Sequence, residues 1–319
     1  MKRILYLFMV ICVYSAIHAQ TLTVKAAKAN NISFTILSGI SDDSIKSKIE
    51  RNVNKILTEV NAAQTAGRNL DFSVMDVNSN VQQTMTMLWE VSPFKCTEEE
   101  IVEPCLTTGT GYQVRNIPLM MKPIGESEFN DEEFQEAVIS FDQQGNVESF
   151  YFSISTNLYM SVIKSNLEPA DLRHRQMILD YIEQIRTAYA QKDIDFLNQV
   201  FCDNDSVLGN ATSSIHYIKN SKKQYIENLR RVFQREDHFK AHFDDIEVRR
   251  HPIEPDFYGV TVLHGWTSGN YHDEGYLFML WDFTDENAPQ IHVRTWQPSM
   301  TNGKPLPKDE IFGLQNIDI

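Results

Sequence analysis

The sequence predicts an α+β protein with two folded parts. In residues 20–166, helical apolar patterns come before most of the strand patterns, and in residues 167–300 three helices come before a series of strands. The composition is 42% hydrophobic and 23% charged, which is typical of a globular protein. A length of 319 residues agrees with about two domains.

The first residues have the pattern of a secretory signal peptide. Lys2 and Arg3 precede an apolar stretch, residues 4–17, and Ala19 ends the segment with a small side chain. We therefore expect cleavage after Ala19 and an exported protein, periplasmic or at the cell surface or extracellular. The apolar stretch is short for a membrane anchor, and no later run is long enough to span a bilayer.

The net charge excludes two classes of partner. The chain has 43 acidic and 29 basic side chains, for a formal charge of −14. Binding to nucleic-acid phosphates, or to anionic lipid heads, needs a basic surface. The expected partners are therefore neither nucleic acid nor a membrane.

The cysteines predict one disulfide. Cys96 and Cys105 bracket an acidic loop, residues 97–104, and an exported chain meets an oxidising compartment. The alternative is two unpaired thiols. Zinc is disfavoured, because no His or further Cys lies close by to complete a ligand set. Cys202 follows Val200 and Phe201 and is expected to be a small buried apolar residue.

The first part begins with alternating strand and helix patterns. Residues 31–37 are apolar and β-branched, which favours a strand, and Ser41 or Asp42 can cap the helix that follows. Residues 70–77 are predicted as a strand and residues 79–89 as a second helix. The first helix has one apolar stripe, formed by Ile45, Ile49, Val53, Ile56 and Val60.

The rest of the first part is mostly strand. Residues 112–122 are a strand candidate, and Pro118 favours an edge position for it. Residues 136–141 and 147–154 flank the turn sequence Gln-Gln-Gly-Asn, which predicts a hairpin. Residues 158–163 form a short helix or a linker.

The second part begins with three helices. A long helix starts near Asp171, Asp193 caps a short second one, and residues 206–209 are a brief strand. Ser221 and Gln224 form a capping box for the third helix. The long helix buries Ile178, Ile182, Ile185 and Tyr189, and the third buries Tyr225, Leu229, Val232 and Phe233.

Strand patterns fill the remainder of the second part. The four candidates are residues 242–249, 257–266, 275–283 and 290–297. The expected division is a signal peptide at 1–19, an α+β domain at 20–166, a second domain at 167–300 and a C-terminal tail at 301–319.

The second part resembles the nuclear transport factor 2-like family. The resemblance rests on the helical segments 177–189 and 192–197, on the capped helix at Ser221, and on the strand segments 275–281 and 291–296. It implies a cone-shaped barrel, in which three helices pack on a strongly bent antiparallel sheet. Ketosteroid isomerase and scytalone dehydratase carry out catalysis in that cone, while many relatives only bind a ligand or another chain. The whole chain also resembles exported two-domain proteins from Bacteroides-like bacteria.

Strand alternation selects the candidate ligand-binding residues. His264 and Trp266 share one face of their strand, and His292, Arg294 and Trp296 share one face of the last strand. If these faces line the cone, the site suits an acidic or aromatic small molecule. Trp281 and Tyr189 are further candidates.

The opposite orientation is an open alternative for these strands. Both faces of residues 275–283 are apolar, so both are expected to be covered. The same side chains would then lie on the outer face, under the first domain or a homodimer partner.

No cofactor motif is present. The sequence lacks G-x-S-x-G, G-x-G-x-x-G and phosphate-loop patterns. His238 and His242 are four residues apart, but this spacing is too long for one metal ion on a strand. We therefore expect a non-catalytic binding or assembly protein without a cofactor or metal. The alternative is a cone enzyme for isomerase or dehydratase chemistry, which requires a buried carboxylate that faces His264 or His292.

Overall fold

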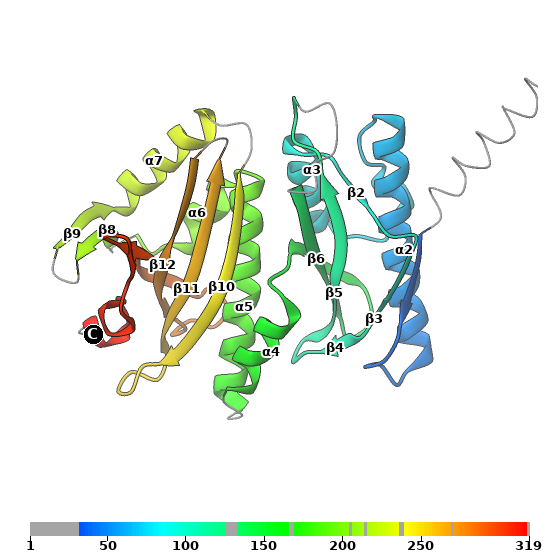
Figure 1. Cartoon of the computed structure of the whole chain (residues 1–319). Coiled ribbons are helices and arrows are strands. Elements are labelled where there is room, and N and C mark those ends of the chain that lie inside the picture. The colour runs from blue at the N-terminus through cyan, green and yellow to red at the C-terminus, as the bar shows by residue number, and fades with distance from the viewer. Residues whose placement is uncertain are drawn as a thin grey trace, which may run out of the picture.

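The structure is a computed structural model that describes residues 32–125, 133–165, 169–203, 206–213, 216–235, 239–268 and 271–317. The predicted signal peptide and His238 lie outside these ranges. Within them, no helix is long and apolar enough to cross a membrane. Two sheets face each other, and the long helix α5 (Pro169–Ala190) lies between them (Figure 1).

The first sheet is formed by β2, β4, β5, β6 and β7. Its order is β2-β5-β6-β7, and β4 also pairs with β5. A separate parallel pair joins β1 to β3, and α2 and α3 pack against the first core. The elements of this part are β1 (Ser33–Ile36), α2 (Asp43–Ala66), α3 (Ser79–Val91), β2 (Phe94–Cys96), β3 (Glu100–Glu103), β4 (Cys105–Thr107), β5 (Gly111–Met121), β6 (Phe134–Asp142) and β7 (Val147–Phe152).

Local sequence signals explain most of this part. The Asp42 carboxylate accepts hydrogen bonds from the backbone N–H groups of Ser44 and Ile45, so the predicted cap of α2 is confirmed. The predicted strand at 70–77 is wrong, because the Asp71 side chain caps a 3₁₀ turn, η1 (Phe72–Val74), instead.

Pro118 does not mark an edge strand, contrary to the prediction. β5 lies inside the sheet, between β6 and the two short strands β2 and β4. The Pro118 carbonyl accepts a hydrogen bond from the Thr97 N–H at the point where β2 ends. The nitrogen of a strand residue points to the same side as its carbonyl. The Pro118 nitrogen therefore points to the gap between β2 and β4, where no ladder hydrogen bond requires an N–H donor.

The predicted disulfide between Cys96 and Cys105 is also wrong, since both thiols are free and buried. Cys96 pairs with Leu119 of β5, whereas Cys105 pairs with Val114. Five strand residues separate these positions by roughly 15 Å. A disulfide needs Cα atoms within about 7 Å, so the register excludes the bond.

The second sheet has six strands in the order β10-β11-β12-β13-β8-β9. It curls around α5, α6 and α7 and forms a cone, so the predicted α+β class is confirmed. The elements are α4 (Thr156–Lys164), α5, α6 (Ile194–Val200), β8 (Ser206–Ser213), β9 (His216–Ser221), α7 (Lys222–Arg235), β10 (Lys240–Arg250), β11 (Phe257–Ser268), β12 (Tyr271–Asp282) and β13 (Gln290–Pro298).

The caps predicted for this part are confirmed. Asp193 accepts from the Phe196 N–H at the start of α6. Ser221 and Gln224 bond reciprocally at the start of α7, as a capping box requires. The domain border at residue 166 stays a prediction, although the first apolar core ends at Phe152 and the second begins at Ile154.

The C-terminal segment covers the outer face of the second sheet. A small hairpin, β14 (Met300–Thr301) and β15 (Lys304–Pro305), leads to the 3₁₀ turns η3 (Lys308–Glu310) and η4 (Leu314–Asn316). Phe312 is buried against Phe278 and Leu280 of β12. The predicted homodimer through this outer face stays a prediction, and part of the face is already covered by the chain itself.

Helix α5 joins the two halves through its polar face. Its apolar stripe enters the second core, while Glu183 and Thr187 face the first sheet. Glu183 forms a buried ion pair with Arg115 of β5 and accepts the backbone N–H of Ile154 at 2.9 Å. Thr187 accepts the N–H of Phe152 at 2.8 Å. These contacts join α5 to β5, to the end of β7 and to the segment that follows β7.

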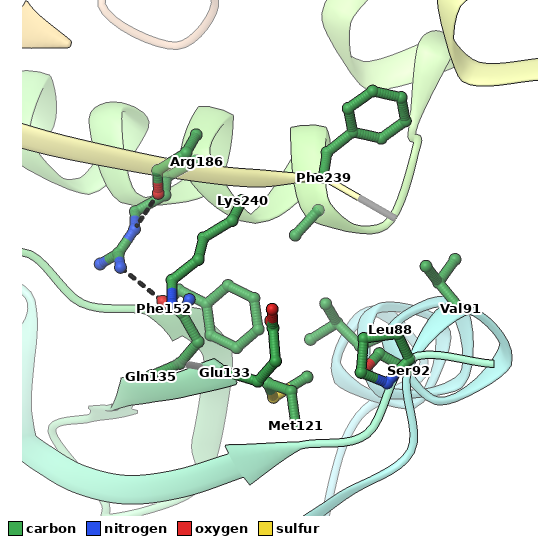
Figure 2. A pocket seen from close by; sticks show the side chains of 13 residues that line it. Leu88, Val91, Ser92, Met121, Glu133, Gln135, Phe152, Arg186, Phe239 and Lys240 are labelled. Carbon is green, nitrogen blue, oxygen red and sulfur yellow. Dashed lines mark hydrogen bonds between the residues drawn. The ribbon is translucent and has the colours of Figure 1, made fainter. Parts of the chain in front are cut away.

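Two arginines of α5 cover the edge strand β10. Arg186 donates to the carbonyl of Ala241, and Arg175 donates to that of Val248, each at 2.9 Å. Arg186 also donates to Gln135 of β6 at 2.6 Å (Figure 2). The helix thereby covers carbonyls that would otherwise stay open to another strand.

We predict that Glu183→Gln destabilises the whole chain. The substitution leaves the Arg115 guanidinium buried without a counter-charge, and breaking a buried pair in this way costs about 3–5 kcal/mol. Urea unfolding, followed by circular dichroism, measures the loss. The matched control is Lys55→Met, which removes an exposed pair with Asp76 and should cost less than about 1 kcal/mol.

The double variant Arg115→Met/Glu183→Gln checks the cause. It contains no unpaired charge, so it should be more stable than Glu183→Gln alone. Equal losses in Glu183→Gln and Lys55→Met would contradict a structural role for the pair.

Candidate functional site

Strand β11 directs His264 and Trp266 into the cone. His264 is 4% exposed and packs against Phe243 of β10, with ring centroids 5.2 Å apart. Trp266 is half-buried and contacts Phe239 at 5.1 Å. Both side chains follow the inward alternation of Val260 and Val262.

A β-bulge separates His292 from Arg294 on β13. Ile291 pairs with Trp281 of the inner core, but Val293 pairs with Leu280 on the outer face, so one residue is extra between them. His292 therefore lies on the outer face, with its Nε2 atom 3.1 Å from the Asp282 carboxylate. The expectation that His292 shares a face with Arg294 is wrong for this reason.

Five side chains form a continuous group inside the cone, which we call the cone cluster. The Arg294 guanidinium lies 5.0 Å from the centroid of the Tyr225 ring, and the hydroxyls of Tyr225 and Tyr189 are 2.8 Å apart. The Tyr189 ring meets Trp266 edge to face at 5.1 Å. Trp266 lies 6.1 Å from His264. The cluster thus joins two strands to α5 and α7.

The two other predicted tryptophans lie outside the cone cluster. Trp281 is fully buried in the second core, 5.1 Å from Tyr181. Trp296 is half-buried and lies over Gly275, where an added Cβ would approach its ring to 2.7 Å. Trp281 is a packing residue in this arrangement, while Trp296 retains exposed surface.

Tyr225 is a member that sequence analysis assigned only to the buried face of its helix. The signal was available, because the Ser221 capping box places Tyr225 in the first turn of α7. What could not be predicted is that this turn lies opposite Arg294. That contact depends on the packing of α7 over the sheet.

The cone cluster holds polar groups that the protein itself does not satisfy. Neither ring nitrogen of His264 has a hydrogen-bond partner among the described residues, and neither does the buried Nε of Arg294. Burial, together with Arg294 and His242, lowers the pKa of His264 to about 3. His264 is therefore neutral at ordinary pH, with one nitrogen able to donate and the other able to accept.

No carboxylate pairs with Arg294 or His264 among the described residues. The other predicted site histidine, His292, contacts the Asp282 carboxylate on the outer face. The pairing that isomerase chemistry required is therefore not formed inside this part of the cone. In the part of the chain that the structure describes, no group of three or more His, Cys, Asp or Glu side chains is arranged to hold a metal.

A second polar network, which sequence analysis missed, lies near the start of α5. His174 contacts the Tyr258 hydroxyl at 3.1 Å through Nδ1 and Glu286 at 2.9 Å through Nε2. Beside it, the buried Asp171 pairs with Arg175. Because both ring nitrogens of His174 are engaged, this network is a structural link between α5 and the second sheet.

One cavity, beside α3 and the start of β10, is too small for a ligand. It has a volume of about 30 Å³, room for about one water molecule, and lies among Leu88, Phe152, Arg186 and Lys240 (Figure 2). Arg186 is bound by three acceptors here, and burial lowers its pKa to about 10. The guanidinium therefore stays charged and engaged.

Comparison with known proteins returns similar folds only. No protein-family model matches the sequence, and no curated protein matches it. A nuclear transport factor 2-like protein from Cytophaga hutchinsonii is 16% identical, with a TM-score of 0.32, over 39% of this chain and 97% of that one. Another, of unknown function, from Pseudomonas putida is 14% identical, with a TM-score of 0.33, over 42% and 93%.

A third similar structure is matched over less than half of its own length. Bd1075 from Bdellovibrio bacteriovorus is 14% identical, with a TM-score of 0.34, and the match covers 50% of this chain and 46% of that one. Less than half of that protein is therefore matched. At these identities and scores, function has to be argued from the residues of this chain.

We predict that His264→Leu stabilises the protein while it removes part of the site. Burying polar atoms without partners costs about 1–3 kcal/mol, and a leucine of similar size removes them. The free energy of unfolding should rise by about 1 kcal/mol in urea titrations. His242→Leu, at a half-exposed histidine on the neighbouring strand, should change it by less than about 0.5 kcal/mol. A clear loss of stability in His264→Leu would mean that the imidazole is a packing group.

Proposed function

We propose that the C-terminal cone binds a small aromatic anion, such as an aromatic carboxylate, without catalysis. The observation that carries the proposal is Arg294, a half-buried guanidinium among aromatic rings with no carboxylate partner among the described residues. A chain with an excess of acids has ample counter-charges for a cation. An arginine left without one is suited to an anion that comes from outside.

The neighbours of Arg294 suit an aromatic ligand. Tyr225, Tyr189 and Trp266 supply ring faces and edges, which pack favourably against another ring. The neutral His264 and the buried Nε of Arg294 offer unused hydrogen-bonding capacity in the same cluster. A carboxylate on an aromatic ring would meet the charge and the ring contacts at once.

The alternative functions have weaker support. A cone enzyme needs a carboxylate beside the cone histidine, and the described residues place none there. Assembly through the outer sheet face would have to use surface beyond Phe312 and its neighbours. Export, to the periplasm or the cell surface, remains part of the proposal through the signal peptide alone.

We expect calorimetry to show that the protein prefers carboxylates to amides. The probes are benzoate and 2-naphthoate, and the neutral controls are benzamide and 2-naphthamide. A hydrogen bond to a charged group contributes about 1.5–3 kcal/mol, which corresponds to roughly tenfold to a hundredfold in affinity. Arg294→Met should abolish this preference, because the amide and the carboxylate then meet the same uncharged surface.

The matched control is Arg249→Met, which removes an exposed arginine of β10 and should leave the preference unchanged. Equal affinity of the native protein for acid and amide, or no binding of either, would overturn the anion site. So would a preference that survives Arg294→Met. Chemical conversion of a probe during incubation would instead favour the cone enzyme.

A further inference from the structure

A second cavity lies on the opposite side of α5 from the cone. Its volume is about 460 Å³, within the ordinary range of small-molecule sites. It opens between α5 and the strands β5, β6 and β7 of the first sheet. The residues that line it are Thr108, Thr110, Tyr112, Gln113, Ser140, Phe141, Asp142, Glu148, Ser149, Tyr151, Asp180 and Glu183.

The charged groups of this cavity are all acidic. Glu183 is neutralised by its ion pair with Arg115. Asp142 is engaged in the hairpin turn, where it accepts from Gln144 and Asn146. Asp180 has no cationic partner among the described residues, and its recorded bond is from the Gln113 amide at 3.0 Å. Glu148 is exposed to solvent at the rim. Asp180 is therefore the half-buried carboxylate of the cavity that lacks a counter-charge among the described residues.

We propose that this cavity is a binding site for a small organic ammonium ion that carries a hydroxyl group. Asp180 would supply the counter-charge. The rings of Tyr112 and Tyr151 line the same space and can pack against alkylammonium groups, as aromatic side chains do around cations. Thr108, Thr110, Ser140 and Ser149 supply hydroxyls for the polar end of such a ligand. This site is independent of the proposed anion site in the cone.

Helix α5 and strand β5 position Asp180. It projects from the middle of α5, a helix whose neighbouring residue Glu183 is fixed by Arg115 and by the Ile154 N–H. Gln113 of β5 holds one carboxylate oxygen. The side chain is half-buried and lines the cavity, so the other oxygen can meet a ligand. A rigidly held carboxylate of this kind favours binding, because little order has to be imposed when the ligand arrives.

The ionisation of Asp180 provides a second readout. Burial and the neighbouring Glu183 raise its pKa to about 7, against the opposing effects of Gln113 and Arg115. Burial and Asp180 also raise the pKa of Tyr151, to about 12, so this tyrosine stays neutral. An ammonium ligand should therefore bind better at pH 8.5, where Asp180 is ionised, than at pH 5.5.

The raised pKa of Asp180 also makes the stability of the protein depend on pH. A folded-state pKa above the unfolded value of about 3.9 makes the folded chain bind the proton more tightly. This contribution is complete below the unfolded pKa and is lost as the pH rises to about 7. The native chain should therefore lose stability relative to Asp180→Asn as the pH rises from 4 to 7. A urea titration that shows this difference would also show that the variant is folded.

The experiment is calorimetry of the full chain with choline and with 3,3-dimethylbutan-1-ol, its uncharged carbon isostere. Choline keeps its charge at every pH, so only the protein titrates. We expect choline to bind at least tenfold more tightly than the alcohol at pH 8.5, and the ratio to fall several-fold at pH 5.5. Asp180→Asn should bring the two probes to equal affinity.

The control is Asp76→Asn, at an exposed carboxylate beside Lys55 and outside the cavity, which should leave the ratio unchanged. Equal binding of choline and the alcohol to the native chain would overturn the site. A ratio that survives Asp180→Asn, or no binding of choline at 10 mM, roughly 2.7 kcal/mol of affinity, would do the same. Arg294→Met should not change the affinity for choline. The ammonium site and the anion site can therefore be disproved independently of each other.

Discussion

The ion pair between Arg115 and Glu183 fixes the position of α5, and with it both halves of the molecule. The two side chains are 2% and 1% exposed, so each depends on the other for its charge to be tolerated. Glu183 also accepts the N–H of Ile154, and Arg115 donates to the carbonyl of that residue. The chain between the two sheets is thereby anchored through both the N–H and the carbonyl of one residue, Ile154.

This arrangement gives α5 two different surroundings. Tyr189 faces the cone cluster, which contains Arg294, and Asp180 faces the cavity of the first sheet. Tyr189 comes nine positions after Asp180 on the same helix. An amphipathic helix normally has one apolar and one solvated face. Here the second face is also covered, so its polar groups require partners from the first sheet. Asp180 accepts its hydrogen bond from the neutral amide of Gln113.

Sequence patterns predicted the features that depend on neighbouring residues. The caps at Asp42, Asp193 and Ser221 involve bonds within three residues, and the inward alternation of β11 needs only strand geometry. The failures involve long-range pairing. A one-residue bulge moved His292 to the outer face, and the register of two short strands on β5 kept Cys96 from Cys105. Arg115 and Glu183 are 68 residues apart, and no local pattern marks them as partners.

The unpaired charges on the two sides of α5 are the part of the structure that folding does not explain. Arg294 and Asp180 have opposite charges, and a contact between them would remove the cost of leaving each without a counter-ion. They lie instead on opposite sides of α5, each beside aromatic rings. Apolar substitutes at either position would satisfy a core at lower cost. Groups that are unfavourable for stability, and whose missing partner a ligand could supply, are expected where a sequence has been shaped by binding. The two proposed sites, one on each side of α5, would therefore take ligands of opposite charge.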